Sequence, residues 1–368
     1  MHVLMTADTV GGVWTYTREL VTGLCARGVR VTLVSFGAIP TDDQVAWVSQ
    51  VDGLDYRPTS YRLEWMQDSH ADLDLSRNYL SRIVREVRPD LIHSNQYAFG
   101  DLSSKIPCIV VAHSDVVSWW VSVHGEEPPE SEWMRRYRDT VTRGIRAASA
   151  VVAPSQWMLE AIRSYYLHPG NGRVIYNGVP SQKCQYSGEK QPCVLTVGRL
   201  WDKAKQVSLL MQYQYRVPVL IVGSEDHPEE QRRENTALRR KSCSLQFLGR
   251  RSQAELEVLY GRASIYAATA CYEPFGLAPL EAALAGCALV ANDIPVFHEL
   301  WGDSAYYFRR NDPVQLAKAI ETLASDADLS RKYGQSAHQH ATSKFSVDKM
   351  CDEYQQLYCT LISQGTAA

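Results

Sequence analysis

Short runs of apolar, β-rich residues alternate along the chain with longer stretches in which apolar positions recur at helical spacing. Residues 2–7 predict a strand, residues 14–26 predict a helix that Gly28 ends, and residues 29–36 predict a second strand. This βαβ opening predicts a parallel sheet with right-handed crossovers. Ser155 predicts the N-cap of a helix over 156–166.

The alternation stops once and then starts again. Residues 178–192 are polar, contain turn formers and show no periodicity, which predicts an interdomain linker. The predicted strands before the linker, after the opening pair, are 91–94, 108–113, 150–153 and 173–177, and those after it are 193–197, 217–222, 245–248 and 264–268. We therefore expect an α/β fold of two Rossmann-like, doubly wound parallel-sheet domains that face a central cleft. A helix is expected over 228–241.

The predicted domain boundaries follow from these patterns. We expect an N-terminal Rossmann-like domain over 1–177, the linker over 178–192, and a C-terminal Rossmann-like domain over 193–345. The remaining residues, 346–368, predict a helix that carries Tyr354 and Tyr358 at helical spacing and crosses back to the N-terminal domain.

Composition narrows the class of protein. The chain has 368 residues, of which 45% are apolar and 21% charged, and its net charge of −3 argues against nucleic acid as a partner. Nine cysteines without a CxxC pair are typical of a reduced, cytoplasmic protein. No signal peptide or apolar run of about 20 residues is present, so we expect no membrane span. Peripheral association with the inner face of the membrane stays open.

Two loops at predicted strand ends have residue types suited to an anionic ligand. Gly11 and Gly12 let the backbone approach a ligand closely at a helix N-terminus, although a turn without a ligand explains them equally well. Arg199 and Lys205 supply the two positive charges that a diphosphate needs. Solvated surface cations are the alternative, and Lys203 competes with Lys205 for the role.

The segment 273–281 is the most specific signal. Gly276, Leu277 and Ala278 begin a predicted helix and would expose unpaired N–H groups, which favour an anion. Glu273 and Glu281 flank them. Two carboxylates beside a diphosphate fit only if they accept hydrogen bonds from hydroxyl groups such as those of a sugar and a ribose. The alternative, that Glu281 only complements the helix dipole, leaves the glycine and Glu273 unexplained.

Candidates in the first half are weaker. His113 follows a buried strand and lies at its carboxyl end, where ligands bind, although a lone histidine is more often structural. Trp119, Trp120 and His124 would form a wall for an acceptor sugar, but core packing explains the tryptophans equally well.

These elements together resemble the GT-B fold, retaining glycosyltransferases of family 4 (group 1), and the resemblance covers nearly the whole chain. It implies that Gly12 and its neighbours approach the donor phosphates, that His113 contacts the donor sugar, and that Arg199 and Lys205 hold the diphosphate. In the second half, the resemblance implies that Glu273 and the amides of Phe275 and Gly276 bind sugar hydroxyls, and that the amides of Leu277 and Ala278 bind phosphate. It also implies that Glu281 binds the ribose and that Gly249 and Arg250 contact the base.

The resemblance implies metal-independent transfer of a hexose from a nucleotide diphosphate sugar, with no cofactor. UDP-glucose is expected from the frequency of donors in the family, and the acceptor is expected to be a saccharide or a lipid-linked saccharide in polysaccharide or glycoconjugate synthesis. A nucleotide-sugar epimerase and a non-catalytic nucleotide-sugar-binding protein remain alternatives on the same fold. A nicotinamide cofactor is disfavoured because GxGxxG is absent. Oligomeric state is not predicted.

Three further patterns suggest ligands but have simpler explanations. Asp72 and Asp74 resemble a DxD metal motif, and we instead expect helix capping. His338 and His340 lack metal-ligand spacing and are expected at the surface. The basic stretch could meet anionic lipid, but a solvated helix face is the favoured interpretation; its members are Arg135, Arg136, Arg138, Arg143 and Arg146.

Overall fold

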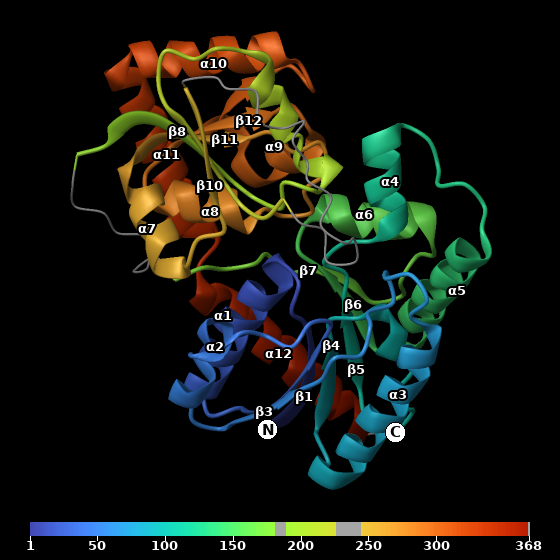
Figure 1. The fold of residues 1–368 in the computed structure, drawn as a ribbon. Helices are drawn as coiled ribbons and strands as arrows, with labels where there is room; N and C mark the ends of the chain where they lie inside the picture. The colour runs from blue at the N-terminus through green and yellow to red at the C-terminus, as the bar shows by residue number, and fades with distance from the viewer. Residues whose placement is uncertain (181–188, 226–243, 367–368) are drawn as a thin grey trace. The chain divides into compact units, whose positions relative to one another are not determined.

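The computed structural model describes residues 1–180, 189–225 and 244–366. The helix expected over 228–241 and most of the expected linker lie outside these ranges. The described chain forms two compact units, each an α/β structure built on its own parallel sheet (Figure 1). Unit 1 comprises residues 1–178 and 347–368, and unit 2 comprises residues 179–346.

Unit 1 contains a seven-stranded sheet in the order β3-β2-β1-β4-β5-β6-β7, and every paired strand is parallel. The strands are β1 (His2–Asp8), β2 (Arg30–Phe36), β3 (Leu54–Pro58), β4 (Leu91–Ser94), β5 (Cys108–Val111), β6 (Ala150–Ala153) and β7 (Gly172–Val174). The central strands are buried on both faces, which explains their continuous apolar sequence.

The helices of unit 1 cover both faces of this sheet. They are α1 (Gly12–Ala26), α2 (Asp42–Val45), α3 (His70–Val87), α4 (Val116–His124), α5 (Glu132–Ala147), α6 (Gln156–Tyr165) and α12 (Val347–Thr366). Figure 1 shows α1 and α12 side by side on one face and α3 and α5 on the other. Helices α1 and α12 approach each other closely at Gly23, where a Cβ atom would lie only 2.4 Å from the Cys351 sulfur.

Unit 2 contains a six-stranded parallel sheet in the order β10-β9-β8-β11-β12-β13. Its strands are β8 (Gln191–Val197), β9 (Val219–Val222), β10 (Leu245–Gly249), β11 (Ala263–Ala268), β12 (Ala288–Asn292) and β13 (Tyr306–Phe308). Its described helices include the 3-10 helices η4 (Lys203–Lys205) and η5 (Val207–Gln212) and the α-helices α7 (Gln253–Arg262), α8 (Leu277–Leu284), α9 (Pro295–Trp301), α10 (Pro313–Ser325) and α11 (Ala327–Lys344).

Most predicted elements are confirmed, with differences at the boundaries. The Ser155 side chain accepts a hydrogen bond from the Met158 amide and caps α6, as predicted. β8 begins at Gln191, two residues inside the expected linker, and the strand expected over 173–177 is only Gly172–Val174. The sequence patterns missed β3, β12 and β13.

Two findings bear on the expected environment of the protein. Within the described ranges, every cysteine is a free thiol. No helix of the described chain is both long and apolar enough to cross a membrane.

Candidate donor site

Most donor-site candidates of unit 2 lie on loops at the carboxyl ends of two neighbouring strands, β8 and β11. Hydrogen bonds hold these two loops together. The Thr269 hydroxyl donates to the Lys205 carbonyl at 2.7 Å, and the Cys271 amide donates to the Ala204 carbonyl at 2.9 Å. The side chains that leave these loops are therefore held at one edge of the sheet.

Lys205 and Glu273 meet at this edge. The Lys205 ammonium donates to a carboxylate oxygen of Glu273, and the two side chains are 20% and 16% exposed. The aliphatic part of Lys205 crosses Gly198, where a Cβ atom would lie 3.6 Å from the lysine Cγ and Cδ atoms. Lys203, in contrast, is exposed. The geometry therefore favours Lys205 over Lys203 as the cation beside Glu273.

Arg199 is held by a second carboxylate. Its guanidinium lies 2.8 Å from the buried Asp202 carboxylate and 5.1 Å from the centre of the Trp201 ring. Asp202 also accepts a hydrogen bond from the Ala204 amide and caps η4. Lys205 is the last residue of this short 3-10 helix.

Helix α8 begins at Leu277, shortly after Glu273 in the chain. Gly276 adopts a left-handed backbone with a φ of 92°, and a Cβ atom there would lie 3.1 Å from the Glu273 Cγ atom. Glycine is therefore required by both conformation and space. No side chain caps α8. The first-turn amides of Leu277 and Ala278 have no intrahelical acceptor, which is the arrangement of an anion site.

Glu281 lies one turn further along α8 and is buried. Burial and the negative charges of Glu273 and Glu281 raise the pKa of Tyr266 well above its usual value, while hydrogen bonding to Val197 opposes this shift. Both carboxylates thus lie near the same β11 side chain. A small pocket at this edge is lined by Gly198, Lys205, Tyr266 and Glu273, among others.

Gly249 ends β10, which lies two strands away from β8, and Arg250 follows it. A row of glycines connects these strand ends. The Gly223 amide donates to the Gly249 carbonyl at 3.0 Å, and a Cβ atom on Gly223 would lie 1.7 Å from the Gly198 carbonyl oxygen. The backbone of three neighbouring strands therefore approaches closely here. The Arg250 side chain is exposed.

Asn292 was not predicted from the sequence, yet it supports both loops. Its buried side-chain amide donates to the carbonyls of Thr269 and Ala270, at 3.3 and 3.1 Å, and to the side chain of Asn311 at 2.9 Å. It also lies 3.5 Å from the side-chain oxygen of Gln206. Asn292 ends β12, a strand that the sequence patterns missed, so no signal drew attention to it.

In unit 1, His113 is held at the carboxyl end of β5. Its Nε2 atom lies 2.8 Å from the Asn95 side-chain oxygen, and its ring packs edge-on against Tyr16 of α1 at 4.5 Å. Burial lowers the pKa of His113 to about 3, with a smaller contribution from His93. The ring is therefore neutral at physiological pH.

Gly11 and Gly12 follow β1 and begin α1, and both are exposed. Gly11 has a positive φ of 76°. The Asp8 carboxylate accepts a hydrogen bond from the Val10 amide at 2.6 Å and orders the approach to the loop. Since Tyr16 lies one turn after Gly12, the structure brings His113 close to the start of α1.

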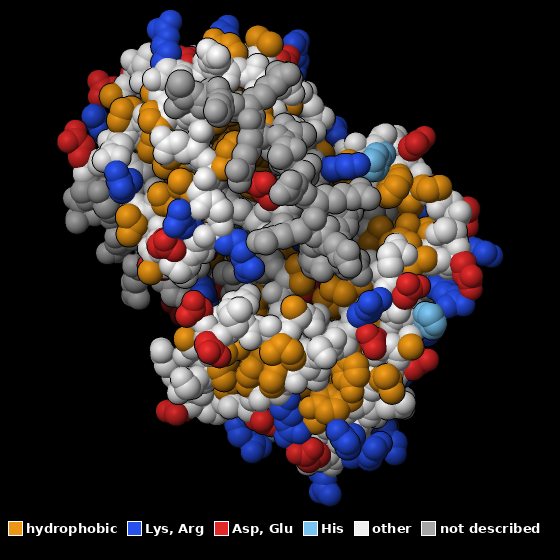
Figure 2. Space-filling view, viewed as in Figure 1, with side chains coloured by type: hydrophobic (Ala, Val, Ile, Leu, Met, Phe, Trp, Pro, Cys, Tyr) orange, Lys and Arg blue, Asp and Glu red, His pale blue; other side chains and the backbone are white. Residues whose placement is uncertain are grey.

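The three acceptor candidates lie together on α4. The His124 ring packs against Trp120 at 4.4 Å and lies 6.0 Å from Trp119. Asp115, which caps α4, accepts hydrogen bonds from the Ser118 amide and the Tyr166 hydroxyl. Both tryptophans are half-buried and His124 is exposed. Figure 2 shows hydrophobic side chains gathered over α4.

The simpler explanations of the other motifs need revision in detail. Asp72 lies in the first turn of α3 behind the Ser69 N-cap, and its carboxylate accepts from the Arg62 amide, so it does not cap the helix. His338 and His340 are half-buried and bond to the carbonyls of Leu284 and Leu300, so they are not free surface groups. The described residues contain no cluster of three metal-ligating side chains.

The basic stretch on α5 is largely neutralised. Four of its arginines pair with carboxylates, Arg135 with Glu130, Arg136 with Glu132, Arg138 with Glu127 and Arg143 with Asp101. Figure 2 shows acidic and basic side chains interspersed over this helix. A solvated, charge-balanced face explains α5 better than a lipid-binding patch.

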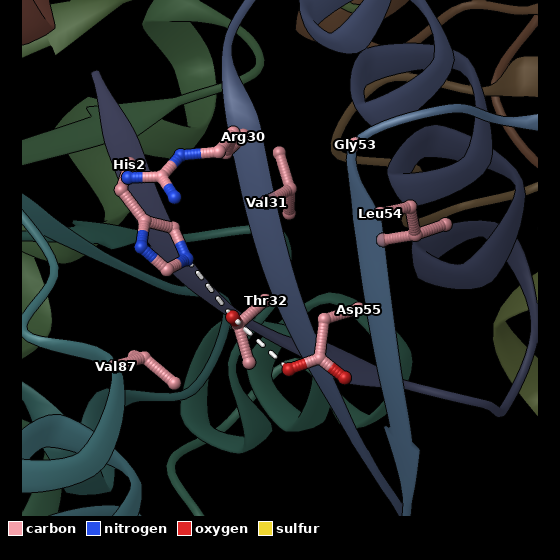
Figure 3. A pocket seen from close by; sticks show the side chains of 8 residues that line it. All are labelled: His2, Arg30, Val31, Thr32, Gly53, Leu54, Asp55 and Val87. Atoms are coloured by element: carbon pink, nitrogen blue, oxygen red, sulfur yellow. Dashed lines mark hydrogen bonds between the residues drawn. The ribbon is translucent and has the colours of Figure 1, made fainter.

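Another pocket lies at the opposite edge of the unit 1 sheet, where β1, β2 and β3 begin (Figure 3). His2 lies 3.0 Å from the Thr32 hydroxyl, which lies 3.4 Å from Asp55. Ligands of doubly wound sheets bind at the carboxyl ends of strands, so this pocket is at the wrong edge for the predicted chemistry.

The two sheets and their carboxyl-edge loops define the class of protein. Residues 10–183 match the family model for glycosyltransferase family 4, and residues 182–340 match the model for group 1 glycosyl transferases. The chain belongs to the GT-B, family-4-like glycosyltransferases, and the predicted fold and family are confirmed.

Known proteins resemble the chain along most of its length. It is 23% identical to the α-maltose-1-phosphate synthase of Mycolicibacterium smegmatis over 335 residues, which are 80% of this chain and 84% of that protein. The sucrose-phosphate synthase of Thermosynechococcus elongatus has the same fold, with a TM-score of 0.80, 18% identity and coverage of 99% and 100%. The Anabaena protein HepE, in complex with UDP and glucose, matches with a TM-score of 0.74, 18% identity and coverage of 98% and 100%.

Proposed function

We propose that this glycosyltransferase transfers a hexosyl group, with retention of anomeric configuration and without a metal ion, from UDP-glucose to a saccharide or lipid-linked saccharide. The contact between Lys205 and Glu273, beside the uncapped N-terminus of α8, carries the proposal. At this edge of the sheet, the Lys205 ammonium supplies a cation, the Glu273 carboxylate can accept hydrogen bonds from hydroxyl groups, and the first amides of α8 can donate hydrogen bonds. The complex of HepE with UDP and glucose supports the choice of donor.

In the proposed mechanism, donor binding is an exchange of partners. In the structure Lys205 is paired with Glu273 and Arg199 with Asp202, so both cations are neutralised. The diphosphate would replace Glu273 as the partner of Lys205, and the Glu273 carboxylate would then accept hydrogen bonds from sugar hydroxyls. The amides of Leu277 and Ala278 would donate to phosphate oxygens, and Glu281 would accept from the ribose.

Transfer breaks the bond between the anomeric carbon and the β-phosphate oxygen, and that oxygen gains negative charge. Arg199, Lys205 and the α8 amides would stabilise the charge. The acceptor hydroxyl then attacks the cationic anomeric carbon from the face that the phosphate leaves, and its proton passes to the departing phosphate. The product keeps the donor's configuration, and UDP is released. We propose that His113 and the Gly12 loop contact the same donor.

The proposal is tested by donor binding followed by turnover. A thermal-shift screen of nucleoside diphosphates and nucleotide sugars should select UDP and UDP-glucose. The purified protein should release UDP slowly from UDP-glucose in EDTA, and the Glu273→Gln variant should release at least about 100-fold less. With an added acceptor, NMR should show an α-linked product from the α-linked donor. A β-linked product, or loss of turnover in EDTA, would contradict the corresponding part of the proposal.

A further inference from the structure

A chain of buried polar groups in unit 1 connects the C-terminal helix to His113. The Tyr358 hydroxyl of α12 lies 2.5 Å from Nδ1 of His93, and Nε2 of His93 lies 3.2 Å from the side-chain oxygen of Asn95. The same oxygen lies 2.8 Å from Nε2 of His113. Tyr358 and His93 are fully buried, and Asn95 is 8% exposed. Water therefore does not compete for the hydrogen bonds that join Tyr358, His93 and Asn95.

The position of Asn95 fixes its donor and acceptor atoms. Its amide nitrogen donates to the Thr6 carbonyl at 2.7 Å, and its backbone N–H donates to the Thr6 hydroxyl at 3.0 Å. Rotating the amide by 180° would place its oxygen against the Thr6 carbonyl, so that two acceptors would face each other. The oxygen that faces both histidines is therefore an acceptor.

The protons on both histidine rings follow from this assignment. An acceptor between two imidazole nitrogens requires that both carry hydrogen, so His93 and His113 are both Nε2–H tautomers. The Nδ1 atom of neutral His93 must then accept, and the Tyr358 hydroxyl donates to it. The Tyr16 hydroxyl, 3.3 Å from Nε2 of His93, is a second acceptor for the same N–H group. Burial lowers the pKa of both histidines to about 3, in agreement with neutral rings.

We propose that Tyr358 and His93 are positioning residues that, through Asn95, hold His113 as the Nε2–H tautomer and direct its Nδ1 lone pair to a hydroxyl group of the donor sugar. No described residue hydrogen-bonds to this Nδ1 atom. His113 then recognises the sugar as a hydrogen-bond acceptor and does not act as an acid or as a cation for the diphosphate. The inference rests on the proposed function for its ligand, whereas the tautomer does not depend on the ligand.

The test combines the variant Tyr358→Phe with a matched control, Tyr354→Phe. Both remove one buried hydroxyl from the same face of α12. The hydroxyl of Tyr358 bonds to Nδ1 of His93, whereas that of Tyr354 bonds to Tyr16 and not to His93. Without this donor, His93 can place its proton on Nδ1, and its Nε2 lone pair would then repel the Asn95 oxygen. We expect kcat/KM for donor turnover to fall about tenfold in Tyr358→Phe, the effect of one buried hydrogen bond, and to stay within about twofold in the control.

The tautomer itself is measured by NMR of protein labelled with 15N-histidine. Wild type and Tyr354→Phe should show His113 protonated at Nε2, and Tyr358→Phe should show a mixture of tautomers. His93→Gln, whose amide still supplies a donor to Asn95, should retain more activity than His93→Leu. An Nδ1–H tautomer of His113 in wild type would overturn the proposal, as would identical spectra and kinetics for the two tyrosine variants. If no donor is turned over, the spectra still decide the tautomer, so the two failures are distinguishable.

Discussion

Removing the Lys205 ammonium is the sharpest test of the donor site. In Lys205→Ala the Glu273 carboxylate loses its partner while only 16% exposed, and the diphosphate loses one of its two cations. We expect kcat/KM for donor turnover to fall about 10²- to 10³-fold, which corresponds to about 3–4 kcal/mol of transition-state stabilisation. Lys205→Arg should recover part of this loss, because it keeps the charge but changes its geometry.

The same change lowers stability by a separable amount. Leaving one charge of a largely buried pair without its partner should lower the free energy of unfolding by about 2–3 kcal/mol. The double variant Lys205→Ala, Glu273→Gln removes the unpaired charge as well. It should recover most of the lost stability but none of the lost turnover, so the catalytic effect cannot be ascribed to unfolding.

Lys203→Ala is the matched control for this experiment. Lys203 lies two residues before Lys205, and its side chain is exposed. The variant therefore removes one positive charge without removing a contact with Glu273. UDP release from UDP-glucose, UDP affinity by calorimetry and urea unfolding would be measured for all variants. Equal losses of UDP affinity for Lys203→Ala and Lys205→Ala would refute a specific role for Lys205. Near-normal turnover of Lys205→Ala would refute the site.

Three further perturbations test the structure around the site. Gly223→Ala should lower the free energy of unfolding by about 3 kcal/mol or more, because its Cβ atom would meet the Gly198 carbonyl oxygen at 1.7 Å. Gly249→Ala has open space around it and should lower the free energy of unfolding by about 1 kcal/mol. Asn292→Ala leaves two loop carbonyls without a donor and should cost about 2–3 kcal/mol and weaken UDP binding, measured by urea unfolding and calorimetry. Because His93 and His113 have folded pKa values of about 3, below the usual value of about 6.5, the unfolded chain binds more protons between these values. Stability should therefore fall as the pH is lowered from 6.5, by up to about 1.4 kcal/mol per pH unit for each histidine, and urea unfolding at pH 7 and pH 5 that showed no fall would contradict the assignment.

Glu64 contributes to the same pH window with the opposite sign. Burial, and to a lesser extent the charge of Asp8, raises the pKa of Glu64 to about 7. The folded protein therefore binds the additional proton between the unfolded value, about 4.3, and 7, and this contribution to stability is lost as the pH rises through that range. It offsets part of the histidine effect, so the expected net fall in stability between pH 7 and pH 5 is the histidine contribution less that of Glu64.

The parts of the donor site that the sequence predicted are local in the chain. The segment from Glu273 to Glu281 contains a loop, a left-handed glycine and Pro279 in the first turn of a helix. Each of these features depends on neighbouring residues, so residue order alone shows where the amides and carboxylates lie. The contact of Lys205 with Glu273 depends on β8 and β11 lying side by side in the sheet, which the sequence does not show.

The supporting residues could not be predicted in this way. Asn292 matters because strand β12 lies beside β11, and the sequence patterns did not show β12. Gly223 matters because its Cα atom lies against the backbone of β8. Both roles arise from strand order, which a single sequence does not reveal. A glycine after an apolar run is equally common where nothing approaches it.

The chain of hydrogen bonds from Tyr358 to His113 shows that the sequence can mark a residue as a candidate without showing which of its atoms carries a proton. The position of His113 after a buried strand marks it as a candidate, but its protonation depends on Asn95 and His93, and His93 depends on a hydroxyl 265 residues away. Helix periodicity placed Tyr354 and Tyr358 at helical spacing in the last helix without indicating that the Tyr358 hydroxyl has a partner. A buried hydroxyl on such a face must find an acceptor, and here the acceptor decides which nitrogen of a site histidine is free to bind. The C-terminal helix thus contributes to the chemistry of unit 1 as well as to its packing.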